Sequence, residues 1–178
     1  MIRYPQALDD IEVAIGEDWL TRAAARSALF AAAGKYFEEL ISDAGVKTPL
    51  KPFWSEVKDH YIKRQHGKCV YCETALEWGE YAGVQWDLEH FRPKSAVRAW
   101  PGRSSKLRSK YSEFPLGAAF NGYHQLAYSP HNYAASCKTC NSSLKRDYFP
   151  IASQRTQGGR LPSGYLTERP YLVYPPRQ

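Results

Sequence analysis

The sequence lacks the features of a membrane-spanning or secreted protein. Its longest run without Asp, Glu, Lys or Arg, residues 114–137, is broken by proline, glycine and asparagine, so it cannot form a continuous apolar helix across a bilayer. The first ten residues contain Arg3, Asp9 and Asp10 but no apolar segment of the kind that a secretory signal carries. We therefore expect a protein of the reducing cytoplasm with no membrane partner.

Acidic side chains are scarce in the larger part of the chain. Residues 1–50 carry five basic and eight acidic side chains, a net charge of −3, whereas the whole chain carries a net charge of +6. Residues 51–178 therefore have a net charge of +9. This basic part favours a polyanionic partner, and a solvated basic face without a partner is the alternative. The apolar content of 43% is sufficient for a globular core.

Cysteine is also scarce, and its spacing limits the chemistry. The four cysteines form two Cys-x-x-Cys pairs, Cys69 with Cys72 and Cys137 with Cys140. Two disulfides would need an oxidising compartment, and a redox protein of the thioredoxin type needs only one pair. Four thiolates in two pairs match a tetrahedral structural zinc site. Because 64 residues separate Cys72 from Cys137, zinc would clamp the two ends of an inserted structure.

Apolar periodicity and breaking residues predict a mixed α+β domain. A long helix is expected over 18–44, with Gly45 as its stop, and a second helix over 52–66 before Gly67. A short strand is expected over 84–88, with 75–81 as its hairpin partner. Residues 142–148 are expected to form a short helix, and the proline-rich residues 151–178 an extended arm.

Glu89 and His90 place a carboxylate beside an imidazole at the end of the predicted strand. A lone histidine is more often a hydrogen-bonded structural residue than a catalyst, so this pair by itself is a modest signal. Polar residues around the second cysteine pair strengthen it, because Asn132 precedes Cys137 and Asn141 follows Cys140 directly.

Taken in order, Cys69-x-x-Cys72, Glu89-His90, Asn132 and Cys137-x-x-Cys140-Asn141 resemble the zinc-containing HNH endonuclease family. The runs Glu89-His90-Phe91-Arg92-Pro93-Lys94 and Tyr148-Phe149-Pro150 are similar to those of HNH effectors in Septu-type anti-phage systems. The resemblance implies three regions: an N-terminal helical region (1–66), an HNH nuclease core of the ββα-metal type with zinc knuckles (67–150) and the C-terminal arm (151–178).

The resemblance also implies roles for individual residues. His90 would be the general base that accepts a proton from the attacking water. Glu89 and Asn141 would hold a catalytic Mg²⁺ or Mn²⁺, and Asn132 would orient the His90 ring through a hydrogen bond. A partner ATPase of a defence system is a further implication. Many family members have Asp where Glu89 stands, and a basic insert replaces the glycines often found between His90 and Asn132.

Residues 93–110 contain six cations and no acidic residue, which favours binding to a phosphate backbone. A solvated loop is the alternative reading. Together with cations next to the motifs, the expected nucleic-acid contacts are Arg92, Lys94, Arg98, Arg103, Lys106, Arg108, Lys110 and Lys145.

The sequence thus predicts a metal-dependent HNH endonuclease that hydrolyses DNA, with RNA as a second possible substrate, acting as an effector of bacterial anti-phage defence. A zinc-clamped nucleic-acid-binding or adaptor module without catalysis is the rival, and a thiol redox protein is a second one. The set of Glu89, His90, Asn132 and Asn141 discriminates against the first rival, because binding alone does not need it.

Overall fold

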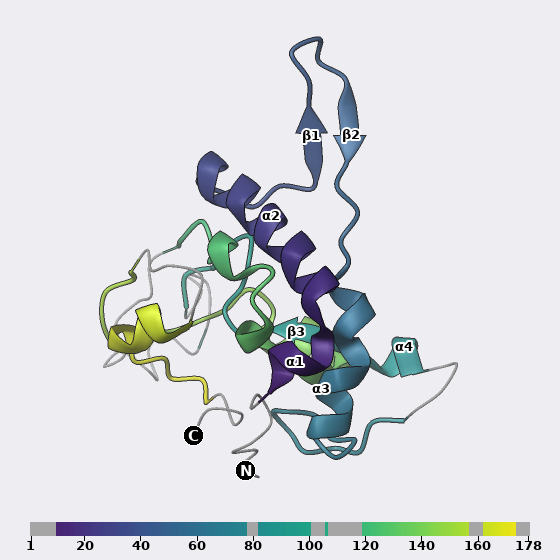
Figure 1. The fold of residues 1–178 in the computed structure, drawn as a ribbon. Helices are drawn as coiled ribbons and strands as arrows, with labels where there is room; N and C mark the ends of the chain where they lie inside the picture. The colour runs from purple at the N-terminus through teal and green to yellow at the C-terminus, as the bar shows by residue number, and fades with distance from the viewer. Residues whose placement is uncertain (1–9, 78–81, 101–105, 107–118, 157–161, 174–178) are drawn as a thin grey trace.

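The computed structural model describes residues 10–77, 82–100, 106, 119–156 and 162–173 (Figure 1). These residues form short helices and two separate two-stranded antiparallel sheets, which confirms the predicted α+β class. Helix α1 spans Ile11–Ile15 and the longer helix α2 spans Glu17–Ala33. None of the helices within these described ranges is long and apolar enough to cross a membrane.

Helix α2 ends eleven residues before the predicted end at residue 44. Gly34 follows the helix in the left-handed conformation, with φ of 65°, and its N–H donates to the Ala31 carbonyl. A residue in this conformation stops an α-helix. Strands β1 (Glu39–Ile41) and β2 (Lys47–Pro49) follow, and Gly45, the expected helix stop, lies in the turn between them with φ of 76°.

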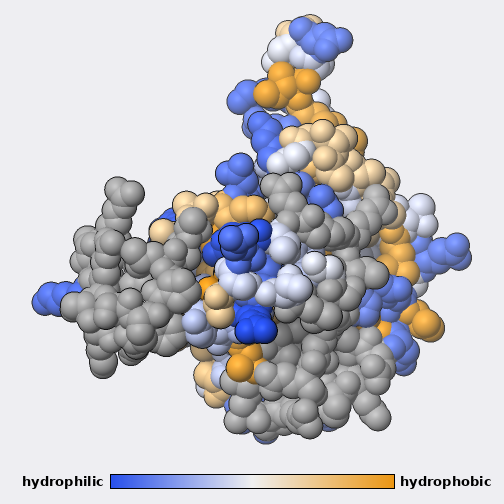
Figure 2. Space-filling model, turned by 90° about the vertical axis from the view of Figure 1, so that its left-hand side faces the viewer, coloured by the Kyte–Doolittle hydropathy of each residue, from blue (hydrophilic) through white to orange (hydrophobic). Residues whose placement is uncertain are grey.

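The β1–β2 hairpin projects from the body of the protein (Figure 1). All six residues of its two strands are exposed. Leu40, Ile41 and Val46 add apolar side chains to this exposed surface, and hydrophobic surface is visible on the projection at the top of Figure 2. The hairpin therefore contributes little to the hydrophobic core.

The predicted second helix is two shorter elements, η1 (Trp54–Val57) and α3 (Lys58–Arg64). Gly67 follows with φ of 68°, and its N–H donates to the Ile62 carbonyl at 2.9 Å, which confirms the expected stop after the helix. The buried Gln65 side chain, at the end of α3, hydrogen-bonds both the N–H and the carbonyl of Ala135. Helix α3 is thereby fixed to the strand that contains Ala135.

That strand is β4 (Tyr133–Cys137), which pairs with β3 (Trp86–His90). The strand expected over 84–88 lies two residues later, because Val84 and Gln85 belong to a short helix (α4, Ala82–Gln85). Its predicted partner over 75–81 is wrong. The partner comes instead from beyond the long insert, as the metal clamp between distant cysteines would require. Helix η4 (Thr139–Lys145) follows β4 directly, three residues earlier than the helix expected over 142–148.

The hydrophobic core joins the N-terminal elements to this β-hairpin and helix. Trp19 of α2 packs against Phe53, Tyr128 and Tyr133 with ring centroids 5.6–6.4 Å apart. Tyr128 lies between two short helices, η2 (His124–Leu126) and η3 (Pro130–Asn132). Residues from both sides of position 66 share one hydrophobic core. The proposed boundaries after residues 66 and 150 stay predictions.

The C-terminal segment is anchored in the interior. Its helix η5 (Pro162–Glu168) carries Tyr165 and Glu168, both almost completely buried. The Glu168 carboxylate accepts hydrogen bonds from the Tyr123 hydroxyl and the Thr156 N–H at 2.9 and 2.8 Å. The described part of the expected arm is therefore packed through buried side chains, beyond a simple extended path over the surface.

Candidate functional site

The four cysteines come together at the end of the β3–β4 hairpin where β3 begins. Cys137 ends β4 opposite Trp86, and Cys140 lies in the first turn of η4. The four Sγ atoms lie within 4.8 Å of one another, and no disulfide joins them. Sulfur atoms around a tetrahedral ion with 2.3 Å bonds are about 3.8 Å apart. The 3.7 Å between Cys72 Sγ and Cys137 Sγ fits such an ion.

Backbone amides support these sulfur atoms. The N–H of Cys137 points to Cys69 Sγ at 3.3 Å, and the N–H of Cys140 points to Cys137 Sγ at 3.4 Å. Donors of this kind stabilise negative charge on metal-bound thiolates. The cluster therefore has the geometry and the supporting contacts of a closed, four-sulfur metal site.

The other end of the same hairpin is fixed by Asn132. Its Oδ1 accepts from the Arg92 N–H at 2.9 Å, and its Nδ2 donates to the Arg92 and Leu126 carbonyls. Its backbone carbonyl also accepts from the Phe91 N–H. Asn132 is 1% exposed and all its contacts go to main chain. The expectation that Asn132 hydrogen-bonds the His90 ring is therefore corrected. The Asn132 side chain instead holds the backbone that follows His90.

The His90 ring is oriented by a main-chain carbonyl. Its Nε2 lies 3.0 Å from the Ala127 oxygen, which also accepts from the Tyr133 hydroxyl. Because a carbonyl can only accept, the proton lies on Nε2 and leaves Nδ1 as the basic nitrogen. The rings of Trp54 and Tyr133 contact the imidazole edge-on, each at 5.0 Å between centroids.

The surroundings of His90 keep the imidazole neutral. Burial, with a smaller contribution from the Lys94 charge, lowers the pKa of His90 to about 3, although the Ala127 carbonyl opposes the shift. At neutral pH the ring is therefore uncharged. General-base catalysis requires this neutral form, but the lowered pKa also makes the metal-free ring a weak base, so the assignment of His90 rests on its place in the cleft.

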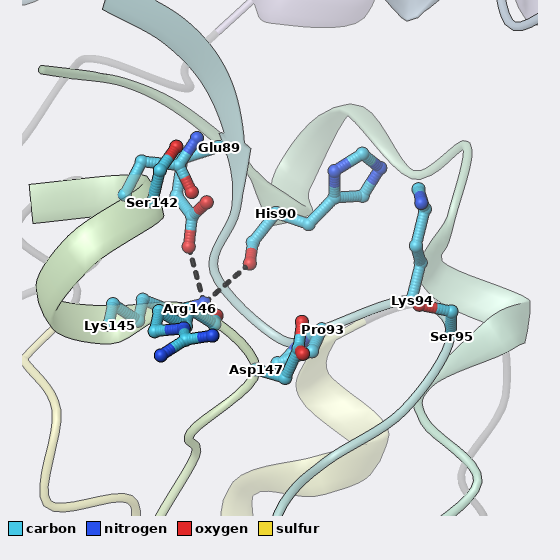
Figure 3. A pocket seen from close by; sticks show the side chains of 10 residues that line it. Glu89, His90, Pro93, Lys94, Ser95, Ser142, Lys145, Arg146 and Asp147 are labelled. Atoms are coloured by element: carbon cyan, nitrogen blue, oxygen red, sulfur yellow. Dashed lines mark hydrogen bonds and ion pairs between the residues drawn. The ribbon is translucent and has the colours of Figure 1, made fainter. Parts of the chain in front are cut away.

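The Glu89 carboxylate is 4% exposed and forms an ion pair with Lys145 of η4. Lys145 Nζ also donates to the His90 carbonyl at 3.1 Å, so it joins both residues at the end of β3 (Figure 3). Burial raises the pKa of Glu89, and the Lys145 charge opposes that rise. In Figure 3 the His90 ring points away from the Glu89 carboxylate, as alternating strand residues do.

Asn141, on η4, hydrogen-bonds a different carboxylate, that of Asp87. Its Nδ2 lies 3.4 Å from Asp87 Oδ2, and Asp87 is in turn paired with Lys138 at 2.7 Å. Glu89 and Asn141 both line a cleft of about 300 Å³ with His90 and Lys94. One carboxylate and one amide oxygen are the hard donors that suit Mg²⁺ or Mn²⁺, with waters completing the shell, so the residues present fit such an ion.

The predicted nucleic-acid contacts fall into different environments. Lys94 lines the cleft, Arg98 is exposed with its guanidinium 3.3 Å from Asp147, and Lys106 is exposed. Lys145 lies in the cleft but is 7% exposed and bound to Glu89. Three of the predicted cations lie outside the described residues: Arg103, Arg108 and Lys110.

Arg92 was predicted to contact nucleic acid, and the structure corrects this prediction. It is 4% exposed, and its guanidinium donates to the Tyr165 carbonyl and lies 3.4 Å from the Glu168 carboxylate. Four aromatic rings surround the guanidinium, those of Phe91, Tyr123, Phe149 and Tyr165. Arg92 therefore joins the C-terminal segment to the end of β3 and presents no charge to a ligand.

Sequence reasoning missed the aromatic residues beside the cleft. The Lys94 ammonium lies 4.2 Å from the Tyr36 ring centroid and 5.1 Å from that of Trp54. Gly122 allows the backbone to approach Lys94, because a Cβ there would lie 2.8 Å from the Lys94 carbonyl oxygen. The glycine was a visible signal for a close approach, whereas Tyr36 and Trp54 had no pattern that could link them to residue 94.

The site thus consists of two strands and a following helix. A four-cysteine cluster lies at one end of the hairpin and the Glu89-His90 pair at the other. No family model and no solved structure matches the chain significantly. The chain is 33% identical to the Septu protein PtuB of Bacillus mycoides (strain KBAB4) over 130 residues. These aligned residues cover 72% of the chain. The chain spans 38% of the length of that relative. The similarity supports the link to Septu-type systems that the motifs indicated.

Proposed function

We propose that this chain is a divalent-metal-dependent HNH endonuclease that hydrolyses phosphodiester bonds, DNA in preference to RNA. One observation carries the proposal: a neutral imidazole with a free Nδ1 lines the same cleft as a buried carboxylate and an asparagine amide. A nucleic-acid-binding module without catalysis has no use for that combination.

In this mechanism His90 accepts a proton from the attacking water at Nδ1. The Ala127 carbonyl fixes the opposite nitrogen, and the Tyr133 hydroxyl bound to the same oxygen holds that carbonyl in place. The imidazole is uncharged before the reaction, so Nδ1 carries a lone pair for that proton. Asn132 contributes indirectly, by fixing the main chain that follows His90.

Glu89 and Asn141 would hold the Mg²⁺ or Mn²⁺. When bound, the ion would stabilise negative charge on the phosphate and on the leaving oxygen. Lys145 holds the Glu89 carboxylate, and Lys94 and Arg146 line the cleft where a phosphate would enter. These cations suit a polyanionic substrate.

We propose zinc as the ion of the four-cysteine cluster, with a structural role. Four sulfur ligands leave no open position for a substrate, and the cluster ties Cys69 and Cys72 to the far end of the long insert. The site holds the β3–β4 hairpin and η4 in register, and so sets the distance between His90 and Asn141.

A role in anti-phage defence is the biological part of the proposal, supported by the similarity to the Septu protein PtuB. A partner ATPase of such a system belongs to the same proposal. The exposed β1–β2 hairpin offers apolar surface to a protein partner.

The direct experiment incubates the purified chain with supercoiled plasmid and, separately, with RNA, in Mg²⁺, in Mn²⁺ and in EDTA. We expect metal-dependent cleavage that leaves 3′-hydroxyl and 5′-phosphate ends, and faster cleavage of DNA than of RNA when both are offered in the same strand form. Binding of either nucleic acid without cleavage in both metals would instead support the non-catalytic binding module.

A further inference from the structure

A second cavity adjoins the catalytic cleft. Its volume is about 280 Å³, close to the 300 Å³ of the cleft itself. The two share four lining residues: Glu89, His90, Lys94 and Asn141. A nucleic-acid strand that crosses the proposed catalytic residues would therefore occupy both cavities, one on each side of the reacting phosphate.

The walls of the second cavity differ from those of the cleft. The cleft is lined by Ser142 of η4 and by Arg146 just after it, whereas the second cavity is lined by Trp54 and Ser55 of η1, by Lys58, and by Asp87 and Leu88 of β3. The Asp87 carboxylate is paired with Lys138 at 2.7 Å. An aromatic face beside cations is the usual arrangement for holding an unpaired base next to its phosphate. The volume of the second cavity, about 280 Å³, lies just below the roughly 300–1,000 Å³ of small-molecule sites, which is a size for one nucleotide at most.

Lys94 stands where the two cavities meet. Its ammonium is held over the Tyr36 and Trp54 rings. The Glu38 and Asp147 carboxylates act on it from beyond ion-pair distance. Figure 3 shows its side chain extending on the same side as the His90 ring. A cation held by rings keeps its capacity to bind an anion, in contrast to Lys145, which is already paired with Glu89.

We propose that the cavity beside Trp54 is a subsite for one unpaired nucleotide, whose base stacks on Trp54 and whose phosphate, the one that is cut, meets Lys94. The proposal rests on the proposed nuclease function and narrows its substrate to strands with an unpaired nucleotide at the cleavage position. Single strands, loops and flaps meet that requirement, whereas a continuous duplex must first be opened there.

Trp54 also packs against core rings, which is the structural explanation for its presence. Its centroid lies 5.4 Å from that of Tyr128 and 5.0 Å from that of His90. These contacts use only part of the ring, because Trp54 is half-buried and lines the cavity with its remaining surface. Of the cations at this cavity, Lys58 is held by the carbonyl and the ring of Trp86, so Lys94 is the cation proposed to meet the phosphate.

The test uses oligonucleotides of one sequence as single strand, duplex and duplex with one unpaired nucleotide, cut under single-turnover conditions. We expect the wild-type chain to cut the two substrates with unpaired nucleotides at least tenfold faster than the duplex. Equal rates on all three would overturn the subsite and leave the nuclease function standing. No cleavage of any of them would reject the nuclease function itself.

A scan with abasic positions then locates the stacked base without changing the protein. One abasic position next to the cut should weaken wild-type binding about 5- to 150-fold, the usual effect of losing one base–aromatic stack. Trp54→Leu should weaken binding similarly, and the abasic position should cost that variant little more. Leu29→Ala, on the exposed side of α2, should keep the wild-type abasic profile. The proposal would be overturned if no abasic position weakened wild-type binding more than the others. It would also be overturned if Trp54→Leu showed the same position-dependent loss of affinity as the wild type.

Discussion

The two ends of the β3–β4 hairpin differ in how far their polar groups are already satisfied. At the Cys137 end, four sulfur atoms face one another within 4.8 Å and receive backbone N–H donors. At the His90 end, His90 and Asn141 line an open cleft, and the hydrogen bond that fixes the His90 ring uses its Nε2. One hairpin thus has a closed end and an open end.

The difference separates stability from chemistry. At the closed end, a bound metal would hold the four cysteines together. Its loss should therefore unfold the chain. Groups at the open end are held by main-chain contacts through Asn132 and Ala127 and are free to meet a ligand. Substitutions at the two ends should therefore produce different kinds of defect.

The largest effect is expected at the closed end. Cys137→Ser should abolish metal binding and cooperative folding, because structural zinc contributes about 10–16 kcal/mol and a whole domain is stable by only about 5–15 kcal/mol. Elemental analysis and thermal unfolding followed by circular dichroism measure both. Ser143→Ala, on the exposed side of η4, serves as the control. A Cys137→Ser protein that stays folded without metal would remove the structural role of the cluster.

The buried ion pair beneath the open end comes next. Glu168→Gln leaves the Arg92 charge buried without its carboxylate partner, which should lower the free energy of unfolding by about 3–5 kcal/mol. Urea unfolding gives the value, and Glu17→Gln on the exposed start of α2 should change it little. An unchanged urea midpoint in Glu168→Gln would show that the C-terminal segment is not anchored through this pair.

Asn132→Ala tests the backbone clamp. Loss of the side chain leaves the buried Arg92 N–H without an acceptor, so we expect a loss of about 1–3 kcal/mol in unfolding free energy. Asn132→Asp keeps an acceptor for that N–H and should lose less. Denaturant unfolding of both variants gives the order. The reverse order would contradict the role of Oδ1 in holding the main chain after His90.

Several parts of this fold could be predicted from local sequence signals. The paired cysteines, Gly67 after α3 and the strand before His90 depend on neighbouring residues and were expected correctly. The β1–β2 hairpin was missed because the alanine-rich helix pattern continued past Gly34, and the left-handed conformation of that glycine decided the end of α2.

The partners of polar residues in the site could not be predicted in the same way. Arg92 seemed a phosphate ligand by its place in a basic run, but its carboxylate partner Glu168 lies 76 residues further along the chain. Asn132 was expected to contact the His90 ring, and the main chain of Ala127 took that position instead. Tertiary packing decides these pairs, and it leaves no local pattern.

The smallest expected effect is a shift in titration. The folded pKa of His90, about 3, lies below the usual value of 6.5, so the ring stays neutral as pH falls from 8 to 5 and protonates only near 3. Cleavage should show no loss of rate near pH 6.5 that comes from His90. Lys94→Met should raise the His90 pKa slightly, because it removes a nearby positive charge. NMR titration of the zinc-loaded chain without Mg²⁺ or Mn²⁺, above the pH at which zinc leaves the cysteines, checks that the ring stays neutral, and titration of His90 near 6.5 would contradict the assignment.

His90→Ala tests the central claim most directly, when cleavage and binding are measured on the same oligonucleotide under single-turnover conditions with Mg²⁺ or Mn²⁺. We predict a fall in cleavage rate of about 10²- to 10⁴-fold with affinity nearly unchanged, because a general base acts in the chemical step and phosphate contacts supply most of the affinity. His60→Ala, a half-buried histidine on α3, should cut like the wild type. Wild-type cleavage by a folded His90→Ala protein would contradict the account.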